Sequence, residues 1–273
     1  MVARRCTYRS PPDLPPLLFY GAPGSRLFCP DLHATVAAGV QLITIDRPGY
    51  GGSDRHVGRA LLDWPADVEQ VADQLALEDF AVVGFSMGGV YALACAAAMP
   101  ARLHAAAIAG GACGPLEKDP DAYDDDDRAL TELLLHDPER ARATAETAPW
   151  LLERVRDPEG LLSEDTTPEP DMWVLRERGP RTALEAALRE AMVQGPYGLA
   201  DDWIASVSPW GFDLADIPIE VSLWHGEHDH LESRRSVDLV AEGIPRSRVV
   251  SWPDAGHLGL MKHWDEVLAT VTG

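Results

Sequence analysis

Short apolar runs alternate with segments of helical spacing along most of this 273-residue chain. Glycine and proline turns bound the runs, as they bound buried strands. The expected strands are residues 17–20, 41–45, 80–85, 103–109, 219–224 and 248–252, and the expected helices are residues 26–38, 65–77, 87–99, 233–242 and 261–270. This alternation predicts an α/β fold in which a mostly parallel sheet is flanked by helices on both faces. Residues 1–10 have room for at most one further edge strand.

One interval breaks the alternation. Residues 113–212 hold helical segments, repeated prolines and no convincing strand, so they are expected to form a helical cap inserted into a core of residues 1–112 and 213–273. The insertion has 23 acidic residues against 10 basic ones. The four aspartates at 124–127 predict a solvated helix start or loop rather than a metal site, because adjacent carboxylates do not converge on one ion as spaced ligands do.

Charge and composition narrow the choice of partners and compartment. The chain has 44 acidic and 23 basic residues and a net charge of −21, which repels nucleic acids and anionic membranes. The four cysteines have no CxxC pair or dense spacing, as expected for thiols in a reducing compartment. Prolines interrupt the N-terminus before an apolar signal stretch, and no apolar run reaches about 18 residues. Neither a secretory signal nor a membrane span is expected, and the predicted location is the cytoplasm.

The most specific motif is a G-x-S-x-G sequence at Gly84 to Gly88, with Ser86 at its centre. Ser86 falls between an apolar strand and an alanine-rich helix, where a sharp turn would expose its hydroxyl above the carboxyl end of the strand. Small residues on both sides let strand and helix approach each other. The motif predicts a nucleophile, and the alternative is a buried serine in a glycine-rich turn.

A serine hydroxyl needs a base to take its proton and a carboxylate to orient that base. His257 is the predicted base because it lies in a glycine-containing turn just after the last expected strand. Asp229 is the predicted acid because it directly follows the strand at 219–224, with Glu227 as the rival. The turn after the strand at 103–109 offers no carboxylate, which favours Asp229.

Four stretches of the chain resemble the α/β-hydrolase superfamily. They are residues 20–25, residues 46–53, the Ser86 turn, and the paired loops of Asp229 and His257. The resemblance extends over essentially the whole chain, and it implies an oxyanion hole formed by the backbone N–H groups of Ala22 and Met87. Relatives usually have a histidine where Tyr20 stands, so altered hydrogen bonding of this loop is expected without loss of activity.

The resemblance and the predicted triad together imply a serine hydrolase. Ser86 would attack a carbonyl to form an acyl-enzyme, which water activated by His257 would then hydrolyse, without metal or organic cofactor. The expected substrate is a small apolar ester, lactone or thioester. The alternatives are cleavage of a C–C or amide bond by the same triad, and a receptor that binds ligand with little turnover. Aromatic residues of the insertion are predicted to contact the substrate, namely Trp150, Trp173, Tyr197 and Trp210.

Overall fold

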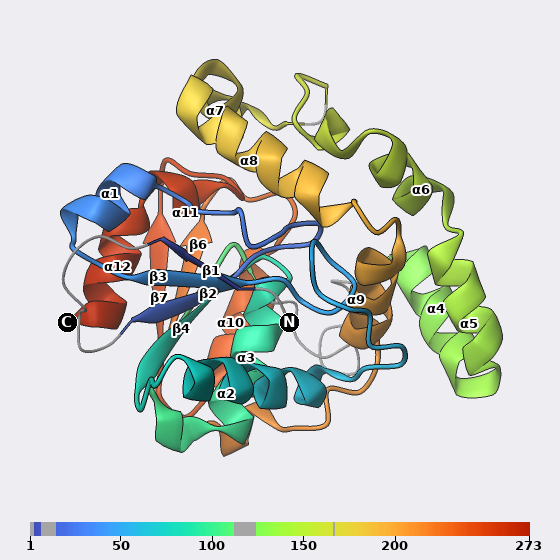
Figure 1. Ribbon diagram of the computed structural model, residues 1–273, viewed down its shortest axis with the longest axis horizontal. Helices are drawn as coiled ribbons and strands as arrows, with labels where there is room; N and C mark the ends of the chain where they lie inside the picture. Colours follow the sequence, from blue (N-terminus) through green and yellow to red (C-terminus); the bar gives the residue numbers. More distant parts are fainter. Residues whose placement is uncertain (1–2, 7–14, 112–123, 166) are drawn as a thin grey trace.

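The computed structural model describes residues 3–6, 15–111, 124–165 and 167–273. These residues form a seven-stranded sheet with the order β1-β3-β2-β4-β5-β6-β7 (Figure 1). Strands β2 to β7 run parallel, and only β1 at one edge is antiparallel. The strands are β1 (Ala3–Cys6), β2 (Pro16–Phe19), β3 (Leu42–Ile45), β4 (Phe80–Phe85), β5 (Leu103–Ala109), β6 (Val221–Gly226) and β7 (Ser247–Trp252). The predicted mostly parallel sheet and its flanking helices are therefore confirmed.

Successive side chains of each strand point to opposite faces of the sheet. Both faces are buried because helices cover each of them. Leu17 and Phe19 belong to one apolar cluster, which also includes α2 (Trp64–Gln74), α3 (Gly88–Ala98) and α10 (Arg234–Gly243). Leu18 and Tyr20 belong to a second cluster on the other face, covered by α1 (Leu32–Ala37), α11 (Gly259–Lys262) and α12 (Trp264–Thr272). The continuous apolar runs in the sequence reflect this burial on both sides.

Two of the expected helices differ in extent from those observed. The helix expected from residue 26 begins only at Leu32, because the Asp31 side chain caps it by accepting a hydrogen bond from the Ala34 amide at 3.0 Å. Arg26 instead donates its amide to the carboxylate of Asp46 at 2.6 Å. The helix expected at residues 261–270 is divided into α11 and α12, which are separated at His263.

In the described part of the chain between β5 and β6, the regular elements are helices, joined by turns and loops. This part contains α4 (Asp125–His136), α5 (Pro138–Glu146), α6 (Pro149–Arg156), α7 (Trp173–Arg176), α8 (Arg178–Ala191) and α9 (Tyr197–Val207), with short 3-10 turns η4 (Pro158–Leu161) and η5 (Glu169–Asp171). These elements run along one side of the sheet domain and over one end of it (Figure 1). The boundaries proposed for a separate cap remain a prediction, and residues 112–123 at its start lie outside the described residues.

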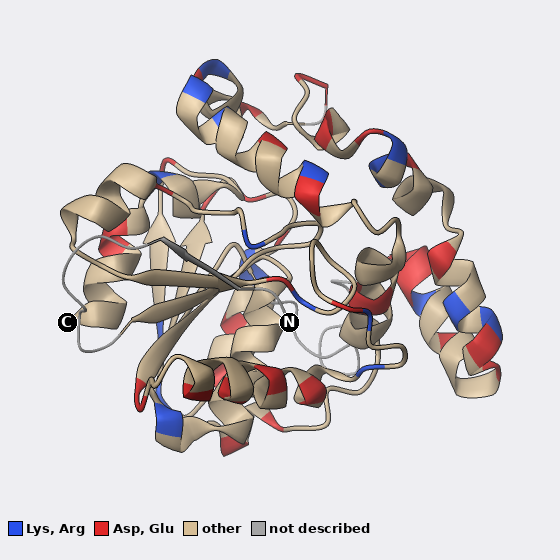
Figure 2. Ribbon diagram, viewed as in Figure 1, with Lys and Arg blue, Asp and Glu red and all other residues tan. Residues whose placement is uncertain are grey.

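Two aspartates at the start of α4 cap this helix. Asp124 accepts a hydrogen bond from the Asp127 amide at 2.9 Å, and Asp127 accepts one from the Asp124 amide at 3.0 Å. This reciprocal pair satisfies two amides that the first turn of a helix leaves free. Acidic residues also occur in α5, α6, α8 and α9 of the insertion and in α2 (Figure 2). None of the helices in the described ranges combines the length and apolarity needed to cross a membrane.

Candidate active site

Ser86 occupies the turn between β4 and α3 with a backbone φ of +52°, in the left-handed region that costs a non-glycine residue about 1–3 kcal/mol. Glycines on both sides make the turn sterically feasible. A Cβ at Gly84 would lie 2.5 Å from the Gly88 carbonyl oxygen, and one at Gly88 would lie 2.0 Å from the Phe19 carbonyl oxygen. The Ser86 amide donates to the Ala109 carbonyl at 3.0 Å, which ties the turn to β5.

The loops after β6 and β7 bring Asp229 and His257 together. The Nδ1 atom of His257 lies 2.9 Å from Oδ2 of Asp229, whose side chain is fully buried. The other carboxylate oxygen of Asp229 accepts hydrogen bonds from the amides of Leu231 and Glu232, at 2.9 and 3.0 Å. With Nδ1 engaged by the carboxylate, Nε2 of the imidazole is left to accept a proton.

The surroundings of this pair favour the charged forms of both His257 and Asp229. Burial by itself would lower the pKa of His257, but the hydrogen bond and negative charge of Asp229 raise it above its ordinary value. Burial would likewise raise the pKa of Asp229, but the hydrogen bond from His257 lowers it. The arrangement therefore stabilises an imidazolium, the species that forms when the histidine takes a proton.

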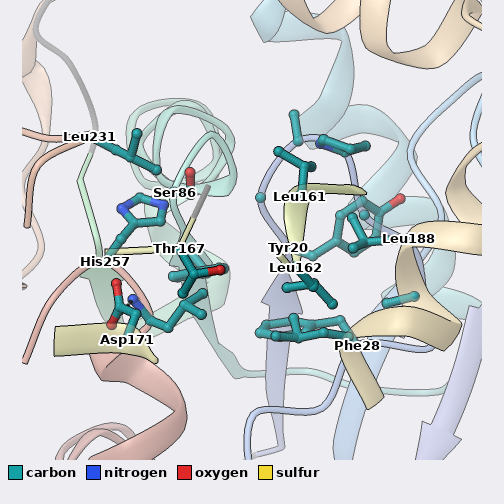
Figure 3. A pocket seen from close by; sticks show the side chains of 18 of the residues that line it. Tyr20, Phe28, Ser86, Leu161, Leu162, Thr167, Asp171, Leu188, Leu231 and His257 are labelled. Atoms are coloured by element: carbon teal, nitrogen blue, oxygen red, sulfur yellow. Dashed lines mark hydrogen bonds between the residues drawn. The ribbon is translucent and has the colours of Figure 1, made fainter. Parts of the chain in front are cut away.

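Ser86 and His257 line the same cavity, which has a volume of about 490 Å³ (Figure 3). The ring of Phe85, the residue before Ser86, lies 5.3 Å from the His257 ring between centroids. The Ser86 hydroxyl makes no hydrogen bond to the described residues. The structure thus places the three predicted residues at one rim of the sheet, above the carboxyl ends of β4, β6 and β7.

The loop after β2 lies directly beside Ser86. A Cβ at Gly21 would lie 3.0 Å from the Ser86 Cβ. The Arg47 guanidinium binds the carbonyl oxygens of Tyr20 and Gly21, at 2.6 and 3.2 Å. Because the C=O and N–H of a trans peptide point in opposite directions, the Ala22 N–H is directed away from Arg47. Within the described residues, neither this amide nor that of Met87 at the start of α3 has a hydrogen-bond acceptor.

Tyr20 supports this loop through its hydroxyl. The Arg47 amide donates to the Tyr20 hydroxyl oxygen at 2.8 Å, while the guanidinium of Arg47 lies 4.4 Å from the Tyr20 ring centroid. The Tyr20 side chain therefore holds the loop after β2 against the residue that follows Asp46.

Arg47 in turn depends on Asp202 of α9, and both side chains are fully buried. The Asp202 carboxylate accepts hydrogen bonds from Arg47 Nη2 at 2.6 Å and from the hydroxyls of Tyr50 and Tyr91 at 2.9 and 2.6 Å. Arg59 forms a second ion pair with it. Burial would raise the pKa of Asp202, but Arg47 and Arg59 lower it to about 2. An acid of the insertion thus holds the arginine that orients the loop beside Ser86.

The walls of the cavity are largely aliphatic. Leucines from the insertion and from the loops of the sheet domain surround the space, namely Leu161, Leu162, Leu184, Leu188, Leu231 and Leu258. Its polar groups besides Ser86 and His257 include Arg154, Thr167, Asp171 and His230. The Thr167 hydroxyl is buried and has no hydrogen-bond partner among the described residues. A buried hydroxyl without a partner costs about 1–3 kcal/mol, so a ligand that bonded to it would recover that energy.

The four aromatic residues expected to contact substrate lie elsewhere, which differs from the sequence-based expectation. Trp210 is 3% exposed and packs in the apolar cluster on the α2 and α3 face of the sheet. Trp150 packs edge-to-face on Trp203, and Tyr197 stacks against the guanidinium of Arg55. Trp173 lines a separate groove beside α1. These rings hold helices together or lie outside the cavity, because aromatic residues pack well in any apolar interface.

Two residues at the site, Asp171 and Asp202, belong to no motif of the sequence and lie far along the chain in the insertion. Arg47, in contrast, lies in a stretch that resembles the family. One signal was available for Asp202, because it is a charged residue within the apolar segment at 199–207. A charge inside such a segment is seldom buried without a partner, so it indicates a buried ion pair.

Comparison with known proteins agrees with this fold. The sequence model of the alpha/beta hydrolase family matches residues 19–270. The chain therefore belongs to the alpha/beta hydrolase family, and it is a hydrolase by fold.

Individual relatives are more distant. Over 97 residues the chain is 36% identical to the 2-hydroxy-6-oxononadienedioate/2-hydroxy-6-oxononatrienedioate hydrolase of Cupriavidus pinatubonensis, a match that covers 34% of this chain and 33% of that protein. Among solved structures, it resembles a thermophilic esterase from Thermogutta terrifontis with a TM-score of 0.67 and 20% identity, over 99% of this chain and 90% of that one. It resembles the enol-lactonase from Burkholderia xenovorans with a TM-score of 0.67 and 18% identity, over 99% and 94% of the two chains. At these identities the structural likeness concerns the fold.

Proposed function

We propose that this protein hydrolyses a carboxylic ester, lactone or thioester of an apolar small molecule through an acyl-enzyme on Ser86. The observation that carries the proposal is the shared cavity of Ser86 and His257, with His257 held by Asp229 at 2.9 Å. The resemblance to an esterase and an enol-lactonase is consistent with this chemistry.

The proposed cycle uses only groups of this chain and water. Ser86 attacks the substrate carbonyl while His257 takes the hydroxyl proton and passes it to the leaving alcohol. The developing oxyanion is stabilised by the amides of Ala22 and Met87, each of which contributes a few kcal/mol, about 3, when preorganised. Water then attacks the acyl-enzyme and gives its proton to His257, which passes it to the Ser86 oxygen as the acid leaves. The left-handed turn at Ser86 supports this role, because it exposes the hydroxyl at the head of α3.

The aliphatic wall favours an uncharged acyl chain, since each buried methylene contributes about 0.8 kcal/mol. C–C or amide cleavage remains the alternative reaction, because the same triad serves it. The partial similarity to a hydrolase named for a dienedioate is the observation that favours testing it. A receptor with the same residues and little turnover is the other alternative.

A fluorophosphonate probe tests the proposal without knowledge of the substrate. We expect covalent labelling that peptide mapping places on Ser86. We expect Ser86→Ala to abolish it, because the reacting oxygen is absent, and His257→Ala to slow it by about 10⁴-fold or more, because the base is removed. Asp238→Asn, on the outer side of α10, serves as the matched control and retains wild-type labelling. A series of p-nitrophenyl esters from acetate to octanoate then reports the acyl preference. A folded wild-type protein that is not labelled would favour the receptor.

A further inference from the structure

A second carboxylate lies against the loop that carries His257. Asp171, the last residue of η5, is 2% exposed and comes from the insertion rather than from the sheet domain. Its Oδ1 accepts a hydrogen bond from the Leu258 amide at 3.1 Å. Asp171 also lines the cavity that contains Ser86, and Figure 3 shows its carboxylate beneath the His257 ring. The His257 loop is therefore held on one side by Asp229 and on another by a residue of the insertion.

Gly256 provides the space that Asp171 occupies. A Cβ at this position would lie 2.5 Å from Oδ2 and 2.8 Å from Cγ of Asp171, too close for either atom to remain. Gly256 does not have one of the positive φ angles found among the described glycines, so backbone freedom does not explain the residue. Its lack of a side chain is what lets the carboxylate reach the loop.

The charges are consistent with this contact. Burial holds the pKa of Asp171 above its ordinary value, although the Leu258 amide, the charge of His257 and the His257 amide oppose this shift. The negative charge of Asp171 in turn raises the pKa of His257, together with the larger effect of Asp229 and that of Glu232. Three carboxylates thus act on the imidazole, and Asp171 is the one that the insertion supplies.

We propose that Asp171 is a positioning residue for His257: by binding the backbone of the histidine loop, the insertion fixes the imidazole relative to Asp229 and Ser86. This inference rests on the proposed function of the triad. The insertion therefore has a second role besides forming the cavity wall, because the base is aligned only while η5 is seated on its loop. Displacement of a catalytic group by about 1 Å can cost about 100-fold in rate.

The test measures the second-order rate of fluorophosphonate labelling of Ser86 as a function of pH, with the full chain. Asp171→Ala removes both the acceptor and the charge, and we expect the plateau rate to fall about 10- to 100-fold. Asp171→Asn keeps an acceptor for the Leu258 amide, so its plateau is expected to stay within about threefold. Its acid limb is expected to move to lower pH, because loss of the negative charge lowers the pKa of His257. A purely structural role would leave this limb in place.

Glu169→Gln is the matched control, since it removes one acidic charge from the same turn at an exposed side chain. We expect it to have wild-type rate and pH dependence. Far-ultraviolet circular dichroism and urea unfolding confirm that each variant is folded before its rate is compared.

Gly256→Ala disrupts the contact between Asp171 and the His257 loop from the side of the loop. The new methyl group would exclude the Asp171 carboxylate, so the rate is expected to fall about as far as in Asp171→Ala. In the double variant the methyl group meets no carboxylate, and we expect a rate no lower than that of Asp171→Ala alone, a non-additive result. Labelling of Asp171→Ala at the wild-type rate with an unchanged acid limb would overturn the inference, as would strictly additive losses. Absence of labelling in the wild type would instead overturn the proposed function.

Discussion

The proposed chemistry depends, at the residue scale, on the protonation state of each group of the proposed triad. His257 must be neutral to accept the Ser86 proton, and its pKa is raised by Asp229 despite its burial. A raised pKa means that the imidazole becomes charged at a higher pH than a free histidine does. The proposed activity is therefore expected to be lost at a higher pH on the acid side than with an isolated imidazole as the base.

We expect the rate of ester hydrolysis or of fluorophosphonate labelling to fall with decreasing pH around a midpoint above 6.5. Asp229→Asn should lower that midpoint, because the neutral amide no longer stabilises the imidazolium, and should reduce the plateau by about 10⁴-fold. The measurement is a pH–rate profile from pH 5 to pH 9. Glu227→Gln, two residues away, is the control and should leave the profile unchanged. A midpoint that stays fixed in Asp229→Asn would contradict the role given to this carboxylate.

The residues of the predicted triad were accessible from sequence because each lies in a turn that directly follows a buried strand. Parallel strands end at the same edge of a sheet, so residues 86, 229 and 257 were expected to converge there. Asp171, Arg47 and Asp202 could not be assigned in this way. Their contacts join residues 87 and 155 positions apart, and they depend on how the insertion packs against the sheet domain.

The elements themselves were predictable to within a few residues, and the differences arise from capping. The side chain of Asp31 caps α1, which begins at Leu32, six residues after Arg26, and a periodic pattern does not show the hydrogen bond that sets this start. The helical character of the insertion was also expected. The buried ion pairs of α9 with the sheet domain were not, because they join Asp202 to Arg47 and Arg59, which lie far away in the sequence.

Loss of this acid should weaken the attachment of α9 to the core. Asp202→Ala leaves Arg47 and Arg59 buried without their carboxylate, and breaking a buried pair in this way costs about 3–5 kcal/mol. We expect the free energy of unfolding in urea to fall by about this amount. Asp238→Asn removes one partner of the exposed Arg234–Asp238 pair and should cost under about 1 kcal/mol. Equal losses in the two variants would show that the buried network contributes no more than a surface pair.

Net charge acts at the scale of the whole molecule. A charge of −21 creates a field that repels anions over about a Debye length, roughly 10 Å at 0.1 M salt. The cavity nevertheless has Arg154 in its lining, with no ion-pair partner among the described residues. Long-range repulsion and local attraction therefore oppose each other for a substrate that ends in a carboxylate.

A pair of esters with six-carbon acyl groups separates these effects. From 10 to 200 mM NaCl, we expect kcat/KM for the p-nitrophenyl monoester of adipic acid to rise about two- to fivefold, because salt screens the repulsion. The neutral p-nitrophenyl hexanoate should change little. Arg154→Gln should raise KM for the adipate ester alone. Equal effects of the variant on both esters would mean that Arg154 does not contact the acyl end.

The buried pair of Arg47 and Asp202 has a consequence for engineering. The carbonyls beside the nucleophile are turned by an arginine of the sheet domain, but the acid that neutralises this arginine belongs to the insertion. A chimera that received another hydrolase's insertion would acquire new pocket walls and lose this counterion. For such a chimera to be active, the transferred segment would have to place a buried carboxylate beside Arg47, whatever substrate specificity it conferred.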